Sequence, residues 1–188
     1  MTSAEMIRRT INFVQTSLAQ SESGHDWWHI HRVQQLATTI AQNEPDANLL
    51  VVELAALLHD IADAKFHAGN EQLAPQISGR FLQKLGLENE LIDQILDIIK
   101  NVSFRHEFGA PAPQILELQI VQDADRLDAM GAIGIARAFS YGGYKMREMY
   151  NPEIKPVVYA NSDEYKTNTA PRDACRRYRG VACVQGCG

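Results

Sequence analysis

The chain has 188 residues, of which 45% are hydrophobic, and it carries a formal net charge of −5 at pH 7. This length and apolar share suffice for one well-buried core, so the sequence predicts a single domain. The acidic balance disfavours a protein that neutralises a nucleic-acid backbone, although it leaves room for a local basic pocket.

Targeting signals and the positions of the cysteines indicate where in the cell the protein is expected. No window approaches the roughly 20 apolar residues that a membrane-spanning helix needs. Residues 1–20 place apolar side chains at helical spacing with polar residues between them, so we expect neither a signal peptide nor a membrane anchor. All three cysteines lie at or after Cys175. We therefore expect a cytoplasmic protein, with neither a nucleic-acid polymer nor a membrane as partner.

Apolar residues at intervals of three and four predict a series of helices. They cover residues 1–20, 25–42, 46–64, 71–85 and 88–102, and a sixth begins near residue 114. Gly86 is expected to stop the fourth helix. Residues 131–136 suggest a close-packed helix joint. From Tyr144 to about Thr169 the pattern is lost, as expected of a long surface loop or lid.

The third predicted helix runs directly into polar residues. Its buried face consists of Val51, Leu54, Leu57, Leu58 and Ile61, and His59 and Asp60 arrive beside this face. A buried His-Asp pair needs a partner, either another side chain or a cation held jointly by imidazole and carboxylate. The dipeptide alone leaves both alternatives open.

Two other helices carry similar polar insertions. In the second, His29 and Arg32 are three residues apart and share a face. In the sixth, an apolar run is followed by three carboxylates and a guanidinium within six residues: Asp123, Asp125, Arg126 and Asp128. We expect Asp128 to pair with one of the neighbouring cations or to accept a hydrogen bond behind the site.

Four side chains are candidate metal ligands, and they are His29, His59, Asp60 and Asp125. Two imidazoles and two carboxylates suit borderline to hard divalent metals and leave positions for water and a substrate oxygen. Three cations lie next to these ligands in sequence: Arg32, Lys65 and Arg126. Positive groups around a metal describe a pocket for phosphate oxygens.

Three segments together carry a family resemblance. Residues 29–33 (His-Ile-His-Arg-Val), 59–60 (His-Asp) and 123–127 (Asp-Ala-Asp-Arg-Leu) resemble, in order and separation, the HD superfamily of metal-dependent phosphohydrolases. The match covers about residues 20–140. It implies an all-α, single-domain helical bundle over residues 1–170 and a metal held by the four candidate ligands. Residues 63–66 (Asp-Ala-Lys-Phe) resemble small stand-alone bacterial members that act on nucleotides.

The resemblance implies metal-assisted hydrolysis of a phosphate ester or anhydride in a small phosphorylated metabolite, with a nucleotide as first choice. Mn²⁺ is the favoured ion, with Mg²⁺, Co²⁺, Ni²⁺, Fe²⁺ and Zn²⁺ as alternatives. Asp63, three residues after Asp60, is the candidate to orient or deprotonate the attacking water. Arg32, Lys65 and Arg126 are candidates to bind the phosphate and to offset its charge during catalysis.

Two other functions compete with this hypothesis. A non-catalytic nucleotide-sensing module would keep the fold and the pocket, although a sensor would more easily lose the ligand set and Asp63. A metal-bound interaction protein would not explain why three cations neighbour the ligands. The bond cleaved and the oligomeric state, a homodimer included, stay open.

The remaining chemistry-bearing residues give weaker signals. A second metal is disfavoured, because the loops around His67 and His106 do not match the pattern of two-metal relatives. One or two tyrosines of the long loop are candidates to stack on a base; the set is Tyr141, Tyr144, Tyr150, Tyr159 and Tyr165. Residues 171–188 hold four Arg, three Gly and all the cysteines without periodicity, and we expect a disordered tail there. The resemblance instead implies a further amphipathic helix after Thr169.

Overall fold

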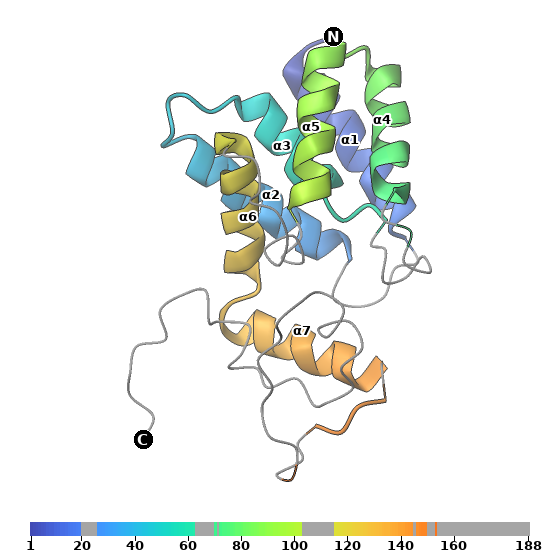
Figure 1. Ribbon diagram of the computed structural model, residues 1–188, viewed down its shortest axis with the longest axis vertical. Coiled ribbons are helices and arrows are strands. Elements are labelled where there is room, and N and C mark those ends of the chain that lie inside the picture. The colour runs from blue at the N-terminus through green and yellow to red at the C-terminus, as the bar shows by residue number, and fades with distance from the viewer. Residues whose placement is uncertain are drawn as a thin grey trace. The chain divides into compact units, whose positions relative to one another are not determined.

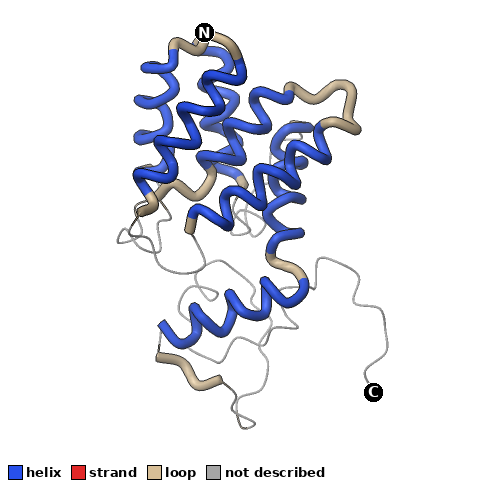
Figure 2. Tube along the Cα trace, turned by 180° about the vertical axis from the view of Figure 1, so that it is seen from behind, coloured by secondary structure: helices blue, strands red, loops and turns tan. Residues whose placement is uncertain are grey.

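A computed structural model of the chain describes residues 1–19, 26–62, 70, 72–102, 115–144, 146–149 and 153. These residues form seven α-helices: α1 (Ser3–Ser17), α2 (Trp27–Ala41), α3 (Leu49–Leu58), α4 (Leu73–Leu85), α5 (Asn89–Asn101), α6 (Leu116–Asp128) and α7 (Gly131–Tyr144). Helices and loops alone make up this part of the chain, without a strand (Figure 2). The all-α prediction is confirmed. No helix within the described ranges is both long enough and apolar enough to cross a membrane.

The structure divides into two compact units. The first, Met1–Leu127, holds α1 to α5 and all of α6 except its last residue, and the second begins at Asp128 and contains α7. The predicted boundary at residue 170 lies outside the described residues. All four candidate metal ligands belong to the first unit.

Local signals set most of the helix ends. The side chains of Thr2, Asp26 and Asn48 accept hydrogen bonds from backbone N–H groups in the first turns of α1, α2 and α3. Such N-caps satisfy donors that have no partner inside the helix. Helix α4 ends as predicted at Gly86, whose φ of 75° is a left-handed conformation that favours glycine.

Helix α3 is the centre of the first unit. It contacts α1, α2 and α5, while α4 packs along α5 (Figure 1). Seven of its ten residues are buried: Val51, Val52, Leu54, Ala55, Ala56, Leu57 and Leu58. A helix that is apolar on nearly every side belongs inside a core. The five residues predicted for the apolar face are all buried, although Ile61 lies beyond the end of the helix.

The predicted C-terminal end of α3, at about residue 64, is wrong. The helix ends at Leu58, and residues 59–62 form a turn in which the N–H of Ile61 donates to the carbonyl of Leu58 over 3.2 Å. The carbonyl of Ala56 accepts a hydrogen bond from the His59 ring. Asp60 therefore does not stand on a helix that continues toward Asp63, and the helical spacing between these two residues no longer supports a shared face.

Helix α6 is anchored by a buried carboxylate near its start. Glu117 accepts one hydrogen bond from the backbone N–H of Asn48, at 2.9 Å, and another from the side-chain amide of Gln94, at 3.2 Å. Asn48 is also the N-cap of α3. One side chain thus ties α6 both to the start of α3 and to α5, two turns before Asp125.

Helix α7, in the second unit, differs from the close-packed joint that its small residues suggested. It is a regular helix that begins at Gly131, whose φ is 64°. Among the described residues of α7, Gly134 is the one that is buried. Ile133, Ile135 and Phe139 each expose more than two fifths of their surface.

Candidate metal site

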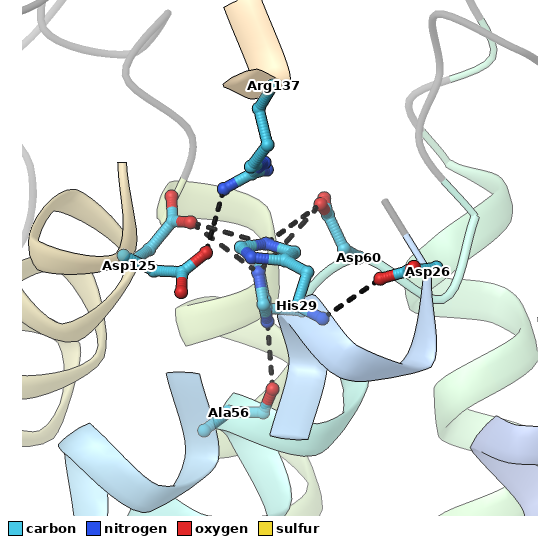
Figure 3. Close-up of polar contacts among 8 residues, drawn as sticks. Asp26, His29, Ala56, Asp60, Asp125 and Arg137 are labelled. Carbon is cyan, nitrogen blue, oxygen red and sulfur yellow. Dashed lines mark hydrogen bonds and ion pairs between the residues drawn. The ribbon is translucent and has the colours of Figure 1, made fainter. Parts of the chain in front are cut away.

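His29 enters the site from the first turn of α2 and is completely buried. The Asp26 carboxylate accepts a hydrogen bond from the backbone N–H of His29, over 3.1 Å (Figure 3). This cap fixes the start of the helix and therefore the direction in which the imidazole leaves it. The local sequence Asp-Trp-Trp-His thus positions its own ligand candidate.

His59 is oriented by the end of α3. Its Nδ1 lies 2.8 Å from the carbonyl oxygen of Ala56, which can only accept a hydrogen bond, so Nδ1 carries the proton. In the neutral imidazole Nε2 then holds a lone pair. This Nε2 is buried and has no hydrogen-bond partner within the described residues. A buried nitrogen lone pair of this kind is suited to bind a cation.

Two carboxylates complete the arrangement. The Nε2 atom of His29 lies 3.6 Å from Oδ2 of Asp60 and 3.5 Å from Oδ1 of Asp125, and Nε2 of His59 lies 3.9 Å from each of the same two oxygens. Figure 3 shows the two carboxylates approaching the His29 ring from different sides. The imidazoles meet nearly perpendicular, with ring centroids 5.3 Å apart.

These distances fit ligands of a common ion better than direct pairs. A hydrogen bond from imidazole to carboxylate needs roughly 2.7–3.2 Å, and all four distances are longer. Two atoms bound to one cation at about 2.1 Å, with an angle near 110°, are about 3.4 Å apart. The ligand atoms of His29, His59 and Asp125 all lie within 4.8 Å of one another. These three residues form a candidate metal site, and Asp60 stands beside both rings.

The four candidate ligands are buried to different extents. Both imidazoles are enclosed, whereas the side chains of Asp60 and Asp125 expose 21% and 34% of their surface. A cation here would be held from the protein side by nitrogen and approached from the open side past the carboxylates. That is the arrangement a site needs if a substrate oxygen and water are to reach the ion.

The predicted cations are described only in part. Arg32 follows His29 by three residues on α2 and is half-buried. Arg126 is exposed, with Nη1 3.6 Å from a carboxylate oxygen of Asp123. Asp63 and Lys65, as well as His67 and His106, lie outside the described residues. Their predicted roles therefore stay predictions.

Asp128, three residues after Asp125, contacts Arg137. Asp128 is almost fully buried, and one of its oxygens accepts a hydrogen bond from Nη1 of Arg137 over 2.9 Å. The sequence left two alternatives for Asp128, an ion pair with one of the neighbouring cations or the acceptance of a hydrogen bond behind the site, and neither alternative named Arg137. Nothing in the sequence spacing indicated Arg137, because Asp128 and Arg137 are nine residues apart and a helix end lies between them.

Of the five candidate tyrosines, the structure describes Tyr141 and Tyr144. Their ring centroids are 6.4 Å apart, and the guanidinium of Arg147 lies over the Tyr141 ring.

The fold and this cluster of two histidines and two aspartates define a class of protein. The family model described as "HD domain" matches residues 27–130, more than half of the chain. The chain belongs to the HD domain family, as the three sequence segments predicted.

Particular relatives agree with this assignment. The Bacillus subtilis protein YpgQ is 42% identical over 151 residues, which cover 80% of this chain and 71% of YpgQ. A crystal structure of YpgQ in complex with ADP superposes with a TM-score of 0.66 at 34% identity, covering 89% of this chain and 79% of that one.

Two further solved structures cover 95% of this chain. A Lactobacillus plantarum protein gives a TM-score of 0.78 at 34% identity over 80% of its own length. A Bacillus thuringiensis protein described as an HD-superfamily hydrolase gives 0.64 at 39% identity over 92% of its length. The chain therefore shares its fold with relatives that span similar lengths.

Proposed function

We propose that this protein is a metal-dependent phosphohydrolase that cleaves a phosphate ester or anhydride in a small phosphorylated metabolite, and that the metabolite is a nucleotide. The observation that carries the proposal is the convergence of two imidazole nitrogens and two carboxylate oxygens at 3.5–3.9 Å, around the buried lone pair of His59. The Bacillus thuringiensis relative described as a hydrolase and the ADP complex of YpgQ support the reaction class and the ligand class.

We assign the ion to His29, His59, Asp60 and Asp125, with Mn²⁺ as first choice. A divalent cation at this place supplies Lewis acidity, because it polarises a phosphoryl oxygen and lowers the pKa of a water molecule. The four side chains would hold the ion in place. Imidazole and carboxylate together suit Mn²⁺ and its neighbours among the divalent metals, and none of the four is the thiolate that softer ions prefer.

The remaining roles concern the substrate. Arg32 stands one turn after His29 on α2, where a guanidinium can bind two phosphate oxygens at once. Lys65 and Arg126 are proposed to offset the rest of the phosphate charge, and Asp63 to orient or deprotonate the attacking water. These assignments rest on their position in the sequence beside the ligands.

The test is phosphate and pyrophosphate release from a panel of nucleotides by metal-stripped protein, with Mn²⁺, Mg²⁺, Co²⁺ or Ni²⁺ added back. Asp60→Asn keeps the shape of the side chain and removes its charge, and we expect release to fall at least about 100-fold. Asp97→Asn, the same change in an exposed ion pair on α5, is the matched control. The product identifies the bond that is cut.

Two results would contradict the proposal. Release that survives Asp60→Asn would place the chemistry elsewhere. A wild-type protein that binds Mn²⁺ and nucleotide but releases no product would favour the nucleotide-sensing module instead.

A further inference from the structure

An aromatic cluster stands beside His29 at the start of α2. It consists of Trp27, Trp28 and His31, and it contains both tryptophans of the chain. The Trp27 ring stacks on His31 with centroids 5.5 Å apart and 28° between the planes, whereas Trp28 meets His31 at 6.1 Å and 76°. Trp28 exposes 62% of its surface.

Helix geometry orders these residues relative to the candidate metal site. Successive residues of an α-helix are rotated by about 100°. Arg32 is four residues after Trp28 and three after His29, so it projects from the arc between them, one turn further along. Around α2 the order is therefore the exposed indole, then the guanidinium, then the imidazole of the candidate metal site.

The two tryptophans are not equivalent. Trp27 is partly buried, packs against the core of the unit and has one face against His31. Trp28 meets His31 at a steep angle, so no ring of the cluster stacks face to face on it. A large exposed indole whose neighbour already restricts its motion offers an apolar face at low entropic cost.

We propose that Trp28 is the platform on which the base of the nucleotide stacks. The inference rests on the proposed function and extends it, because it assigns the base to a residue outside the ligand set. If the phosphates of a nucleotide lie near His29 and Arg32, the Trp28 indole is the next side chain around α2. The base of the nucleotide can then reach it. Stacking on an aromatic ring tolerates every base, since every base has a π face. The inference therefore predicts a preference for nucleotides over inorganic phosphates rather than for one base.

The experiment compares ADP with inorganic pyrophosphate, which carries the phosphates without the base. Dissociation constants of both are measured by calorimetry on the full-length, Mn²⁺-loaded protein. Trp28→Ala is expected to weaken ADP binding about 5- to 150-fold, the range for loss of one base stack, and to leave pyrophosphate binding unchanged. Trp28→Phe should retain most of the ADP affinity. Trp27→Phe makes Trp28 the only tryptophan, and ADP should then quench its fluorescence while pyrophosphate does not.

The outcomes separate the alternatives. If Trp28→Ala weakens ADP and pyrophosphate binding equally, Trp28 supports the structure around His29 instead of the base. If the variant binds ADP as tightly as the wild type, Trp28 does not contact ADP. Either result overturns the stacking role. Unchanged Mn²⁺ affinity and unfolding temperature show that the variant is folded. A wild-type protein that binds Mn²⁺ but neither ADP nor pyrophosphate overturns the proposed function and the stacking role with it.

Discussion

The proton on the His59 ring decides what this side chain can do. Because Nδ1 donates to the Ala56 carbonyl, Nε2 is available as a ligand without any loss of an existing hydrogen bond. This single contact links the end of α3 to the chemistry of the site. It is a backbone carbonyl that orients a ligand from behind, as is usual for histidines that bind metals.

Replacing His59 should therefore remove metal binding selectively. We expect His59→Asn to weaken Mn²⁺ binding by at least about 100-fold, since the amide cannot present a nitrogen lone pair at the same place. The binding is measured by the electron paramagnetic resonance signal of free Mn²⁺. His31→Asn, a histidine change in the same unit but outside the candidate metal site, should leave the Mn²⁺ affinity unchanged. Equal effects of the two variants would contradict the assignment.

A second prediction at the residue scale concerns Glu5 in the first turn of α1. Hydrogen bonds from Arg8 and Arg9 lower the pKa of its carboxyl from 4.5 to about 2. The unfolded chain binds this proton more readily, so the pairs stabilise the fold above pH 4.5 and this stabilisation is lost as the pH falls toward 2. The effect is small because the pairs are exposed.

Thermal unfolding of Glu5→Gln and wild type, followed by circular dichroism, tests this. The wild type should unfold at a slightly higher temperature at pH 7, and the difference should shrink steadily below pH 4.5. A difference that stays constant down to pH 2 would show that the arginines do not act through the charge of Glu5.

At the scale of the elements, the site depends on three helices, α2, α3 and α6, that are joined by partly buried polar contacts. Gln34 and Thr38 of α2 contact the Glu53 carboxylate of α3 at 3.1 and 3.3 Å. Glu117 joins α6 to the start of α3 and to α5. These links lie within about two and a half helical turns of the candidate ligands on the same helices.

Glu117 should accordingly matter for both stability and metal binding. Glu117→Ala removes a buried carboxylate that accepts hydrogen bonds from the Asn48 N–H and the Gln94 amide, so we expect a loss of about 1–3 kcal/mol in the free energy of unfolding. Because α6 carries Asp125, Mn²⁺ affinity should fall as well, although Glu117 touches no ligand. Chemical denaturation and metal titration measure the two effects. Gln119→Ala, an exposed change on the same helix, is the control. Lost stability with intact metal affinity would mean that α6 does not need this anchor to place Asp125.

At the scale of the whole molecule, a bound ion would join segments far apart in sequence. His29 and Asp125 are separated by 95 residues, and the His59–Asp60 turn lies between them. An ion held by all three segments binds the folded chain and not the unfolded one, so it adds to stability by mass action.

We therefore expect Mn²⁺ at about 100 times its dissociation constant to stabilise the protein by about 2.7 kcal/mol, which corresponds to roughly 5–10 °C in Tm. Differential scanning fluorimetry with and without a chelator measures the shift. In His59→Asn, whose affinity is at least about 100-fold weaker, the shift should fall to about 1 °C or less at the same Mn²⁺ concentration. A similar increase in that variant would point to Mn²⁺ bound outside the proposed site.

Sequence patterns predicted six of the seven described helices and named the ligand candidates, whereas α7 was expected only as a helix joint. Gly86 ended α4 as predicted, and all five residues of the predicted apolar face are buried, because local conformation and periodicity are properties of neighbours in the chain. Order and separation of three short segments were enough to indicate the family.

How these parts meet depends on contacts between segments far apart in the sequence. The end of α3 at Leu58, the proton position on His59, the Glu117 anchor and the Arg137 partner of Asp128 all depend on contacts that the sequence pattern does not encode. A periodic pattern reports which side of a helix faces the core, but a hydrogen bond of 3 Å depends on where two backbones lie in space. For this reason the four ligand candidates could be named from the sequence, whereas their convergence within 3.5–3.9 Å required the fold.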